Sequence, residues 1–228
     1  MRIHVYGCSW SAGQPHINNF DSWPRHLALL EPKWKIYNFS YCGSSIHFSS
    51  AMLMQLSKKI KEPVYHIFQG TSPYRWTYFT KSIDPMDYLI QQTSNYFSFY
   101  PRDNYMDFAN IFQPRKDVTQ INFRKYLPSK DVVSLYKKKL KHQSSVEWEL
   151  EYSSIFEAIR NNFNLAFFHK IKDYKIYQQY YNNKVMCTQE ILSDLMWNKF
   201  IADKGDHFGV KGLQWQASFI RDYITKDK

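Results

Sequence analysis

Two residues with the chemistry for nucleophilic catalysis stand near opposite ends of this 228-residue chain, Ser9 and His207. Ser9 follows a run in which Ile3 and Val5 alternate with His4 and Tyr6, which is the pattern of a β-strand ending in a glycine turn. A serine just beyond the carboxyl end of the first strand of an α/β sheet is where a nucleophile or a phosphate-binding group lies. Taken alone, the pattern also fits an ordinary turn.

His207 lies in a polar loop, residues 203–209, just before the last predicted helix. A serine hydroxyl is a poor nucleophile until a base such as imidazole accepts its proton. Asp203 and Asp206 stand close to His207 in the sequence. Taken alone, His207 also fits a surface histidine or a histidine at a helix start.

The elements that would position these residues alternate in type along the first 70 residues. Strand patterns occupy 2–6, 34–39 and 63–69, and helical patterns occupy 23–30 and 45–61. This alternation predicts parallel strands with right-handed crossovers, so that their carboxyl ends meet at one edge of a sheet. The turns at Gly7, Gly43 and Gly70 would converge there.

Glycine usage is concentrated at the same places. An average usage of about 7% predicts about 16 glycines in a chain of this length, but the chain contains seven. All of them fall in the strand-end turns or near His207: Gly7, Gly13, Gly43, Gly70, Gly205, Gly209 and Gly212.

The rest of the chain predicts one domain, 1–228, with 76–143 as a largely helical insertion or cap. Helices are expected over Lys130–Lys141, from Val146 to about Lys170, over Ile191–Ile201 and along a closing segment with Leu213, Ala217, Ile220 and Ile224. A further strand is expected over Tyr174–Tyr180. The longest helix is predicted from an apolar stripe at three- and four-residue spacing: Trp148, Tyr152, Ile155, Ile159, Phe163 and Phe167.

The formal charge of +10 is concentrated in one segment. Residues 114–142 contain nine basic residues against two acidic ones, which leaves +7 there. As a solvated helical insertion this segment would be a lid or an inert surface. As a binding surface it would hold an anionic polysaccharide, phospholipid head groups or nucleic acid, through Lys and Arg charge and Tyr stacking.

Three widely spaced cysteines without a Cys-x-x-Cys or Cys/His cluster favour a reducing compartment and predict no metal site and no cofactor. The chain begins directly with a strand pattern and has no apolar run of about 18 residues. We therefore expect a cytoplasmic protein without a membrane span; a virus or phage origin is also compatible.

Four short motifs resemble a known family in their order and spacing. Gly7-Cys8-Ser9, Gly43 after Asn38, Gly70-Thr71-Ser72 and the Asp/His pair before the last helix resemble blocks I, II, III and V of the SGNH (GDSL-type) hydrolase superfamily. The resemblance covers the first 75 and the last 30 residues. It implies a three-layer α/β/α flavodoxin-like fold and a Ser-His-Asp esterase, acetylesterase or lipase.

By this resemblance Ser9 is the nucleophile, His207 the general base, and Asp203 or Asp206 the acid. Asp203 is slightly preferred, because the side chain of the adjacent Asp206 in an extended loop points the other way. The oxyanion hole would consist of Ser9 N–H, Gly43 N–H and the Ser72 side chain. Trp10 and Arg75 are expected to bind substrate.

Three departures from the family pattern shape the hypotheses. Cys8 stands where the family has Asp. Ser72 stands where the family has Asn, and Arg75 could substitute as the donor. Lys204 occupies the position three before His207 where the family has Asp. The leading hypothesis is hydrolysis of an O-acyl ester, in particular an O-acetyl group on a carbohydrate. The alternative is a catalytically weak scaffold that binds an anionic polymer; a third is a virus- or phage-type accessory or structural protein.

Overall fold

The computed structural model describes the residues that build the sheet, the helices that cover it and the ends of the strands. The described ranges are 1–13, 21–41, 44–70, 75–79, 89–93, 96–99, 108–112, 122–123, 145–162, 165–169, 185–187, 199–200 and 207–226, with single residues at 134, 138 and 142.

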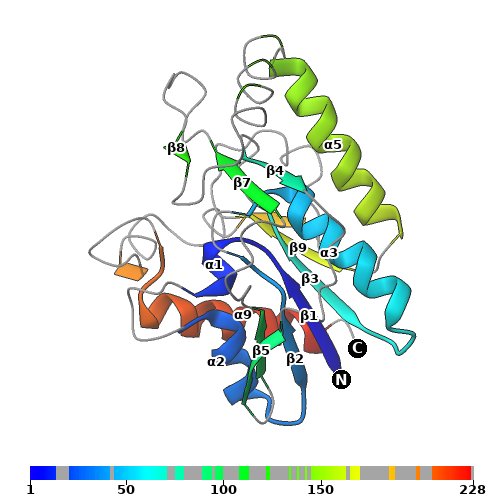
Figure 1. The fold of residues 1–228 in the computed structure, drawn as a ribbon. Helices are drawn as coiled ribbons and strands as arrows, with labels where there is room; N and C mark the ends of the chain where they lie inside the picture. The colour runs from blue at the N-terminus through cyan, green and yellow to red at the C-terminus, as the bar shows by residue number, and fades with distance from the viewer. Residues whose placement is uncertain are drawn as a thin grey trace.

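The centre of the protein is a mostly parallel seven-stranded sheet (Figure 1). Its strand order is β10-β9-β3-β1-β2-β6-β5, and only the β5–β6 pair is antiparallel. The strands are β1 (Arg2–Tyr6), β2 (Lys35–Asn38), β3 (Tyr65–Gln69), β5 (Leu89–Thr93), β6 (Tyr96–Phe99), β9 (Leu165–His169) and β10 (Val185–Cys187).

The first three strands confirm the predicted parallel arrangement. β1 lies between β2 and β3, with Ile3 opposite both Ile36 and Tyr65. The connections are α2 (Trp23–Leu30) and α3 (Ile46–Lys59), close to the predicted ranges. The carboxyl ends of these strands therefore share the edge at which the chain turns from β1 into α1 (Ser9–Ala12).

Helices cover both faces of the sheet, so alternation along β1 separates two cores rather than a core and a solvent face. Ile3 and Val5 face α2 and α9 (Val210–Lys226), whose buried residues include Leu27 and Ala217. Tyr6 faces the other core, which α3 and α5 (Ser145–Asn162) build with Phe39 of the segment after β2. Both faces of β1 are consequently buried.

The longest predicted helix was wrong at its carboxyl end. α5 ends at Asn162, and the residues that follow form strand β9, which pairs in parallel with β3. The run Leu165–His169 is short, apolar and aromatic, so its periodicity alone does not separate a buried strand from a continuing helix. Hydrogen bonding to β3 makes this segment a strand.

The middle of the chain also differs from the largely helical insertion that we expected. The part of 76–143 that the structure describes consists mainly of strands: β5 and β6 extend the main sheet, and β4 (Arg75–Phe79), β7 (Phe108–Phe112) and β8 (Asn122–Phe123) form a three-stranded antiparallel sheet. Aromatic runs such as Tyr96–Phe99 suit a pleated surface, which explains the absence of a helical period. Of the predicted helix Lys130–Lys141, only Ser134 and Lys138 are described, and both are helical.

The predicted closing helix is confirmed as α9, which packs against α2. The predicted strand Tyr174–Tyr180 lies outside the described part of the chain. Of the predicted helix Ile191–Ile201, only Lys199 and Phe200 are described, and both are helical. Among the described helices, none is both long and apolar enough to cross a membrane.

Candidate active site

Ser9 is the first residue of α1, a single helical turn that follows β1 at the carboxyl edge of the sheet. Cys8 adopts an extended conformation before it, and the Cys8 carbonyl accepts hydrogen bonds from the N–H groups of Ser11 (3.0 Å) and Ala12 (2.9 Å). The Cys8 side chain is buried in the α2/α9 core. The sharp change from strand to helix presents the Ser9 side chain at this edge.

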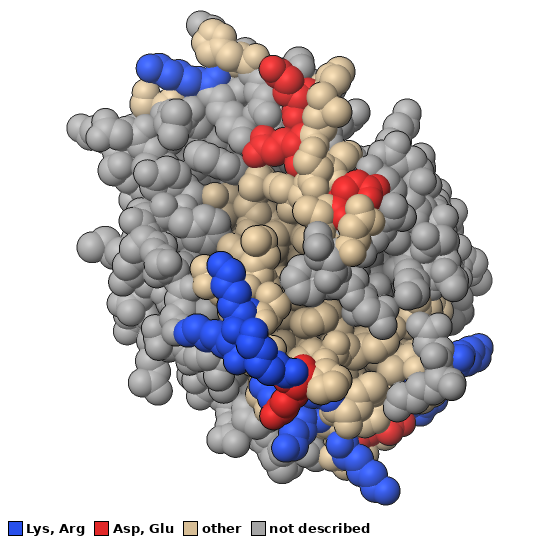
Figure 2. Space-filling view, turned by 90° about the vertical axis from the view of Figure 1, so that its right-hand side faces the viewer, with Lys and Arg blue, Asp and Glu red and all other residues tan. Residues whose placement is uncertain are grey.

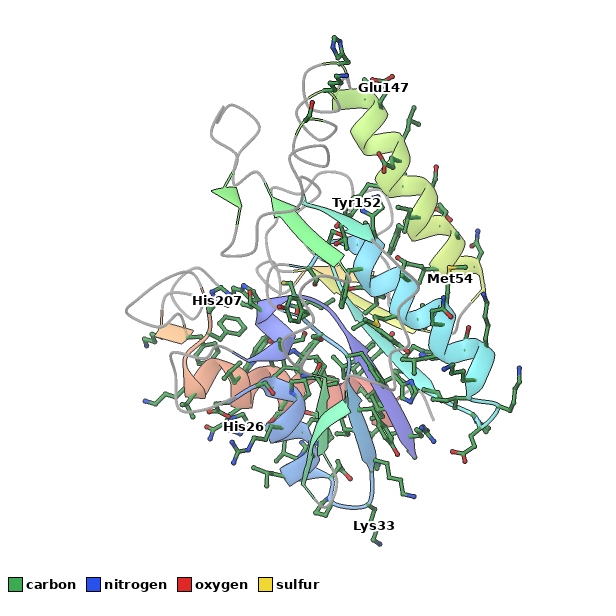
Figure 3. All side chains as sticks on the ribbon, in the orientation of Figure 1. His26, Lys33, Met54, Glu147, Tyr152 and His207 are labelled. Atoms are coloured by element: carbon green, nitrogen blue, oxygen red, sulfur yellow. The ribbon has the colours of Figure 1, made fainter. Side chains whose placement is uncertain are left out.

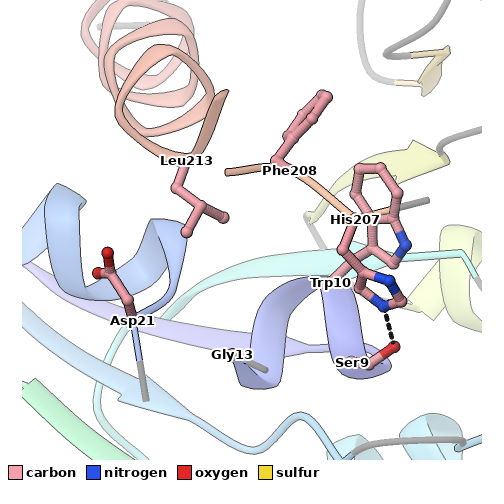
Figure 4. Close-up of a pocket in the computed structure, with 7 residues that line it drawn as sticks. All are labelled: Ser9, Trp10, Gly13, Asp21, His207, Phe208 and Leu213. Atoms are coloured by element: carbon pink, nitrogen blue, oxygen red, sulfur yellow. Dashed lines mark hydrogen bonds between the residues drawn. The ribbon is translucent and has the colours of Figure 1, made fainter. Parts of the chain in front are cut away.

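Ser9 and His207 meet although 198 positions separate them in the sequence. Ser9 Oγ lies 2.7 Å from His207 Nε2 (Figure 4), a distance at which the hydroxyl proton can pass to the ring. Ser9 is only 8% exposed, whereas His207 is partly exposed, so the pair can be reached from the surface. Because Nε2 faces Ser9, the buried Nδ1 atom lies on the other side of the ring, where an orienting acid would have to approach.

The ring of His207 is held by aromatic neighbours. Trp10, the residue after Ser9, stacks on it with ring centroids 5.3 Å apart and planes at 27°. Phe208 meets the same indole edge-on, at 4.8 Å, and is 2% exposed. The rings of Trp10 and Phe208 thus connect α1, which begins with Ser9, to the segment that carries His207.

Gly212 permits this arrangement from within α9. A Cβ at position 212 would lie 2.7 Å from Phe208 Cγ and 2.9 Å from Phe200 Cβ, distances that force a neighbour to move. The sequence prediction placed Gly212 in a loop near His207; it lies instead in the first turn of the helix. Its role is close packing rather than turning.

A buried polar network lies under α1 and connects three elements. Trp23 Nε1 donates to Ser11 Oγ at 2.9 Å, and Ser11 Oγ donates to Gln69 Oε1. Asn38 Nδ2 donates to the carbonyl of Ser11 at 2.6 Å. The side chains at the ends of β2 and β3, together with Trp23 of α2, therefore hold α1 in place.

The same network requires a glycine at the end of β1. A Cβ on Gly7 would lie 2.8 Å from Gln69 Cβ and 3.1 Å from Ser11 Oγ. The Gly7 carbonyl accepts hydrogen bonds from Ser44 Oγ at 2.7 Å and Tyr41 N at 3.0 Å. The loop after β2 is thereby fastened beside Ser9.

A small pocket opens next to the Ser9–His207 pair (Figure 4). Trp10, Phe208 and Leu213 give it apolar walls, and Asp21 lies at the end away from Ser9. Asp21 is a half-buried carboxylate, 2.9 Å from His26 Nε2. Figure 3 shows His207 beside α1, whereas Lys33 lies at the opposite end of the sheet.

The structure brings together part of the predicted site. It joins Ser9 to His207, and it buries Trp10 to 7% exposure against the His207 ring as well as in the pocket wall. Arg75 begins β4, but its side chain lies outside what the structure describes. The other predicted residues also lie outside the described part: Gly43, Ser72, Asp203 and Asp206.

Several supporting residues were missed from the sequence. Asn38 and Gln69 are uncharged polar residues at the carboxyl ends of predicted buried strands. A polar residue at such a position could have indicated that its side chain supports the site. Ser11, two residues after Ser9, and Asp21 before α2 gave no comparable signal because their partners are remote in the sequence.

Comparisons with known proteins give little similarity. No protein-family model matches the chain, and no curated protein matches it. Among solved structures, the X-ray crystal structure of protein YXIM_BACsu from Bacillus subtilis resembles the chain with a TM-score of 0.45 and 8% sequence identity. That similarity covers 99% of this chain and 56% of the Bacillus protein, so the chain spans little more than half of its length.

Proposed function

We propose that this protein is a serine hydrolase of SGNH type that cleaves an O-acyl ester, with Ser9 as nucleophile and His207 as general base. The observation that carries the proposal is the 2.7 Å contact between Ser9 Oγ and His207 Nε2 at the carboxyl edge of a parallel sheet. Proximity alone does not produce catalysis, but a hydrogen-bonded Ser–His pair has the first two elements of a catalytic triad.

The strand order supports the fold part of this proposal. Read from β2 across β1, β3 and β9 to β10, the parallel strands follow the order 2-1-3-4-5 that is typical of flavodoxin-like sheets. Helices on both faces agree with a three-layer α/β/α arrangement. In such sheets ligands bind outside the carboxyl ends of the strands, which is where Ser9 lies.

The reaction would run through an acyl-enzyme. His207 Nε2 accepts the Ser9 proton while Ser9 Oγ bonds to the ester carbon, and the oxyanion faces the Ser9 N–H, which has no intrahelical acceptor at the first position of α1. The ester C–O bond then breaks, and His207 gives its proton to the leaving alcohol. Water, deprotonated by His207, releases the carboxylic acid from Ser9 in the second half of the reaction.

Covalent labelling and turnover test this proposal together. We expect a fluorophosphonate to label Ser9 and p-nitrophenyl acetate to be hydrolysed. Ser9→Ala and His207→Ala should each lower kcat by roughly 10³-fold or more. The exposed residues Ser154 and His142 provide matched controls, and Ser154→Ala and His142→Ala should leave both readouts unchanged. A wild-type protein that neither labels nor exceeds the Ser9→Ala rate would refute the proposal.

A second candidate, a weakly catalytic scaffold that binds an anionic polymer, is supported by charge. Residues 114–142 carry +7, and α3 ends in the exposed residues Lys58 and Lys59, followed by the exposed Lys61. Figure 2 shows that most Lys and Arg side chains drawn on this face gather in its lower half. Salt-dependent binding to nucleic acid or a sulfated glycan, weakened by charge reversal at Lys137–Lys139, would favour this candidate. No binding at low salt would reject it.

A further inference from the structure

The amino edge of the main sheet, opposite to the edge with Ser9, carries concentrated positive charge. β1, β2 and β3 begin at this edge. Residues 31–35 and 58–62, which lead into β2 and β3, contain together with Arg2 six basic residues and two acidic ones, which leaves +4. The lysines among them are all exposed: Lys33, Lys35, Lys58, Lys59 and Lys61.

Backbone pairing and one ion pair bring these segments together. Arg2 lies opposite Lys35 where β1 pairs with β2, and Arg2 Nη1 lies 2.8 Å from Glu62 Oε2 in the segment before β3. Since neighbouring strands are about 4.8 Å apart, the starts of β2 and β3 on either side of β1 are about 10 Å apart. Residues 29–35 and 58–62 with Arg2 therefore form one surface, which we call the amino-edge surface.

Exposed apolar side chains lie on the same surface. α2 ends at this edge, where Leu29 is 68% and Leu30 40% exposed, and the exposed Pro32 follows in the turn to β2. A single exposed leucine is ordinary on a protein surface. Here two adjacent leucines immediately precede a lysine-bearing turn. α5 also exposes apolar side chains, but its sequence contains four glutamates and one arginine, so it combines them with negative charge.

This combination favours an anionic bilayer over nucleic acid. Nucleic acid would use the lysines but offers no apolar layer for Leu29 and Leu30, and its bases stack on accessible aromatic rings. In the described part of this surface, Trp34 is only 7% exposed, and the Arg2 guanidinium lies 4.4 Å from the centre of the Tyr37 ring. A bilayer of acidic phospholipids presents anionic head groups to lysines and an acyl boundary to leucines.

We propose that the amino-edge surface docks the protein on anionic phospholipid bilayers. Leu29 and Leu30 enter the interfacial layer, and the lysine ammonium groups contact head-group phosphates, with their aliphatic stems along the apolar boundary. Figure 3 shows Glu147 of α5 at the end of the molecule away from Lys33, a charge separation that orients the protein toward an anionic surface. The edge with Ser9 then faces water. This inference does not depend on the proposed hydrolase function.

The test is sedimentation with vesicles of phosphatidylcholine, either pure or with about one third phosphatidylserine, in about 0.1 M salt. The wild type should sediment with the vesicles that contain phosphatidylserine and stay in solution with the pure ones. The double variant Lys33→Gln, Lys35→Gln should bind roughly 10-fold more weakly or less, since each lysine near an anionic surface contributes roughly fivefold. Leu29→Gln should weaken binding by about threefold or more.

Two matched variants separate this surface from the rest of the molecule. The double variant Lys137→Gln, Lys139→Gln removes the same charge from residues 114–142, and Leu150→Gln changes a leucine that is 60% exposed on α5. Each should change the affinity by about twofold or less, because salt screens charges far from the docked surface.

Three results would overturn the inference. The first is a wild type whose sedimentation does not depend on phosphatidylserine. The second is an equal loss of binding in the two double-lysine variants, which would mean that net charge and not the amino-edge surface attracts the bilayer. The third is dependence on Lys33 and Lys35 with full binding by Leu29→Gln, which would assign the surface to a purely anionic polymer such as nucleic acid.

Discussion

At the residue scale, Trp10 is the side chain whose placement adds most to the proposed chemistry. We expected it to bind substrate, and it does line the pocket, but its indole also stacks on the His207 ring and touches Phe208. A stacked indole restricts rotation of the imidazole, and in the proposed mechanism it would attract the ring more strongly once that ring becomes a cation. Trp10 would then be a positioning residue for the proposed base.

Substitution of Trp10 tests this role. Trp10→Leu should lower kcat by roughly 10-fold, since an aromatic pair contributes about 0.5–1.5 kcal/mol beyond its buried area. Trp10→Phe keeps an aromatic face and should retain most of the activity. Both rates on p-nitrophenyl acetate are to be measured with the thermal unfolding midpoint. Full activity in a folded Trp10→Leu variant would show that the stack does not position His207.

Ser11 carries the largest polar connection near the site and allows a stability prediction. Ser11→Ala would leave Trp23 Nε1 and Gln69 Oε1 without the hydroxyl that each contacts, in a region where Ser11 is 0% and Gln69 3% exposed. A buried polar group that loses its partner costs about 1–3 kcal/mol, so we expect a loss of about 2–4 kcal/mol of unfolding free energy. Urea denaturation measures it.

Ser154→Ala is the control for this change. The Ser154 hydroxyl also donates a hydrogen bond, in this case to the carbonyl of Leu150, but it lies on the exposed face of α5. Its removal should change the unfolding free energy by about 0.5 kcal/mol or less. Equal losses in the two variants would mean that the network under α1 adds no stability.

At the scale of elements, what could be predicted from the sequence depended on how local the signal was. β1, α2, β2, α3 and β3 follow from alternation, proline and serine at helix starts, and glycine turns, all of which lie within each segment. The parallel order of these strands also predicts that the turn with Ser9 lies at the carboxyl edge of the sheet. These features needed no knowledge of distant contacts. The pairing of Ser9 with His207, in contrast, was expected only from the resemblance to the SGNH blocks.

The failures at this scale came from segments whose neighbours decide their conformation. Leu165–His169 continues the apolar period of α5 but becomes a strand because β3 offers an unpaired edge. The aromatic segment with β6 has no clean period, and its strand forms on β2. Similarly, Gly212 could not be distinguished from a turn glycine, because the contact that requires it comes from Phe208 and Phe200.

The helix α9 provides a prediction at this scale. In an ordinary exposed helix Gly→Ala stabilises by up to about 1 kcal/mol. Gly212→Ala should instead destabilise the protein by about 1–3 kcal/mol, because overpacking forces Phe208 to move. Since Phe208 follows His207, the proposed hydrolysis of p-nitrophenyl acetate should slow as well. Gln214→Ala, at an exposed position of the same helix, should have almost no effect on either quantity; a stabilised and fully active Gly212→Ala would contradict the packing argument.

At the scale of the whole molecule, the central strands contain buried groups that titrate only in acid. Arg2 Nε donates to His4 Nε2 at 3.0 Å, so the neutral His4 ring carries its proton on Nδ1, which lies 3.2 Å from the Tyr6 hydroxyl. That hydroxyl lies 3.3 Å from His66 Nδ1 and can donate to it. The chain of donors is complete only when both histidines are neutral.

Burial, with repulsion from His66 and Arg2, lowers the pKa of His4 to about 3, and burial lowers the pKa of His66 to about 4. The unfolded chain binds these protons near pH 6.5, so between about pH 6.5 and 4 it holds more protons than the folded chain. Stability is therefore fully present above pH 6.5 and falls as the pH drops, by up to about 1.4 kcal/mol per pH unit for each histidine.

The slope of this dependence identifies the groups responsible. His66→Gln should lower stability at pH 7.5, because Tyr6 loses its acceptor, yet it should flatten the decline between pH 6.5 and 4.5 by about one proton. Urea midpoints across this range, converted with a common m-value, give the slope. Ser154→Ala, which removes no titratable group, should leave that slope close to the wild type. If His66→Gln keeps the wild-type slope, acid destabilisation must come from other groups, and the sheet's histidines are not its cause.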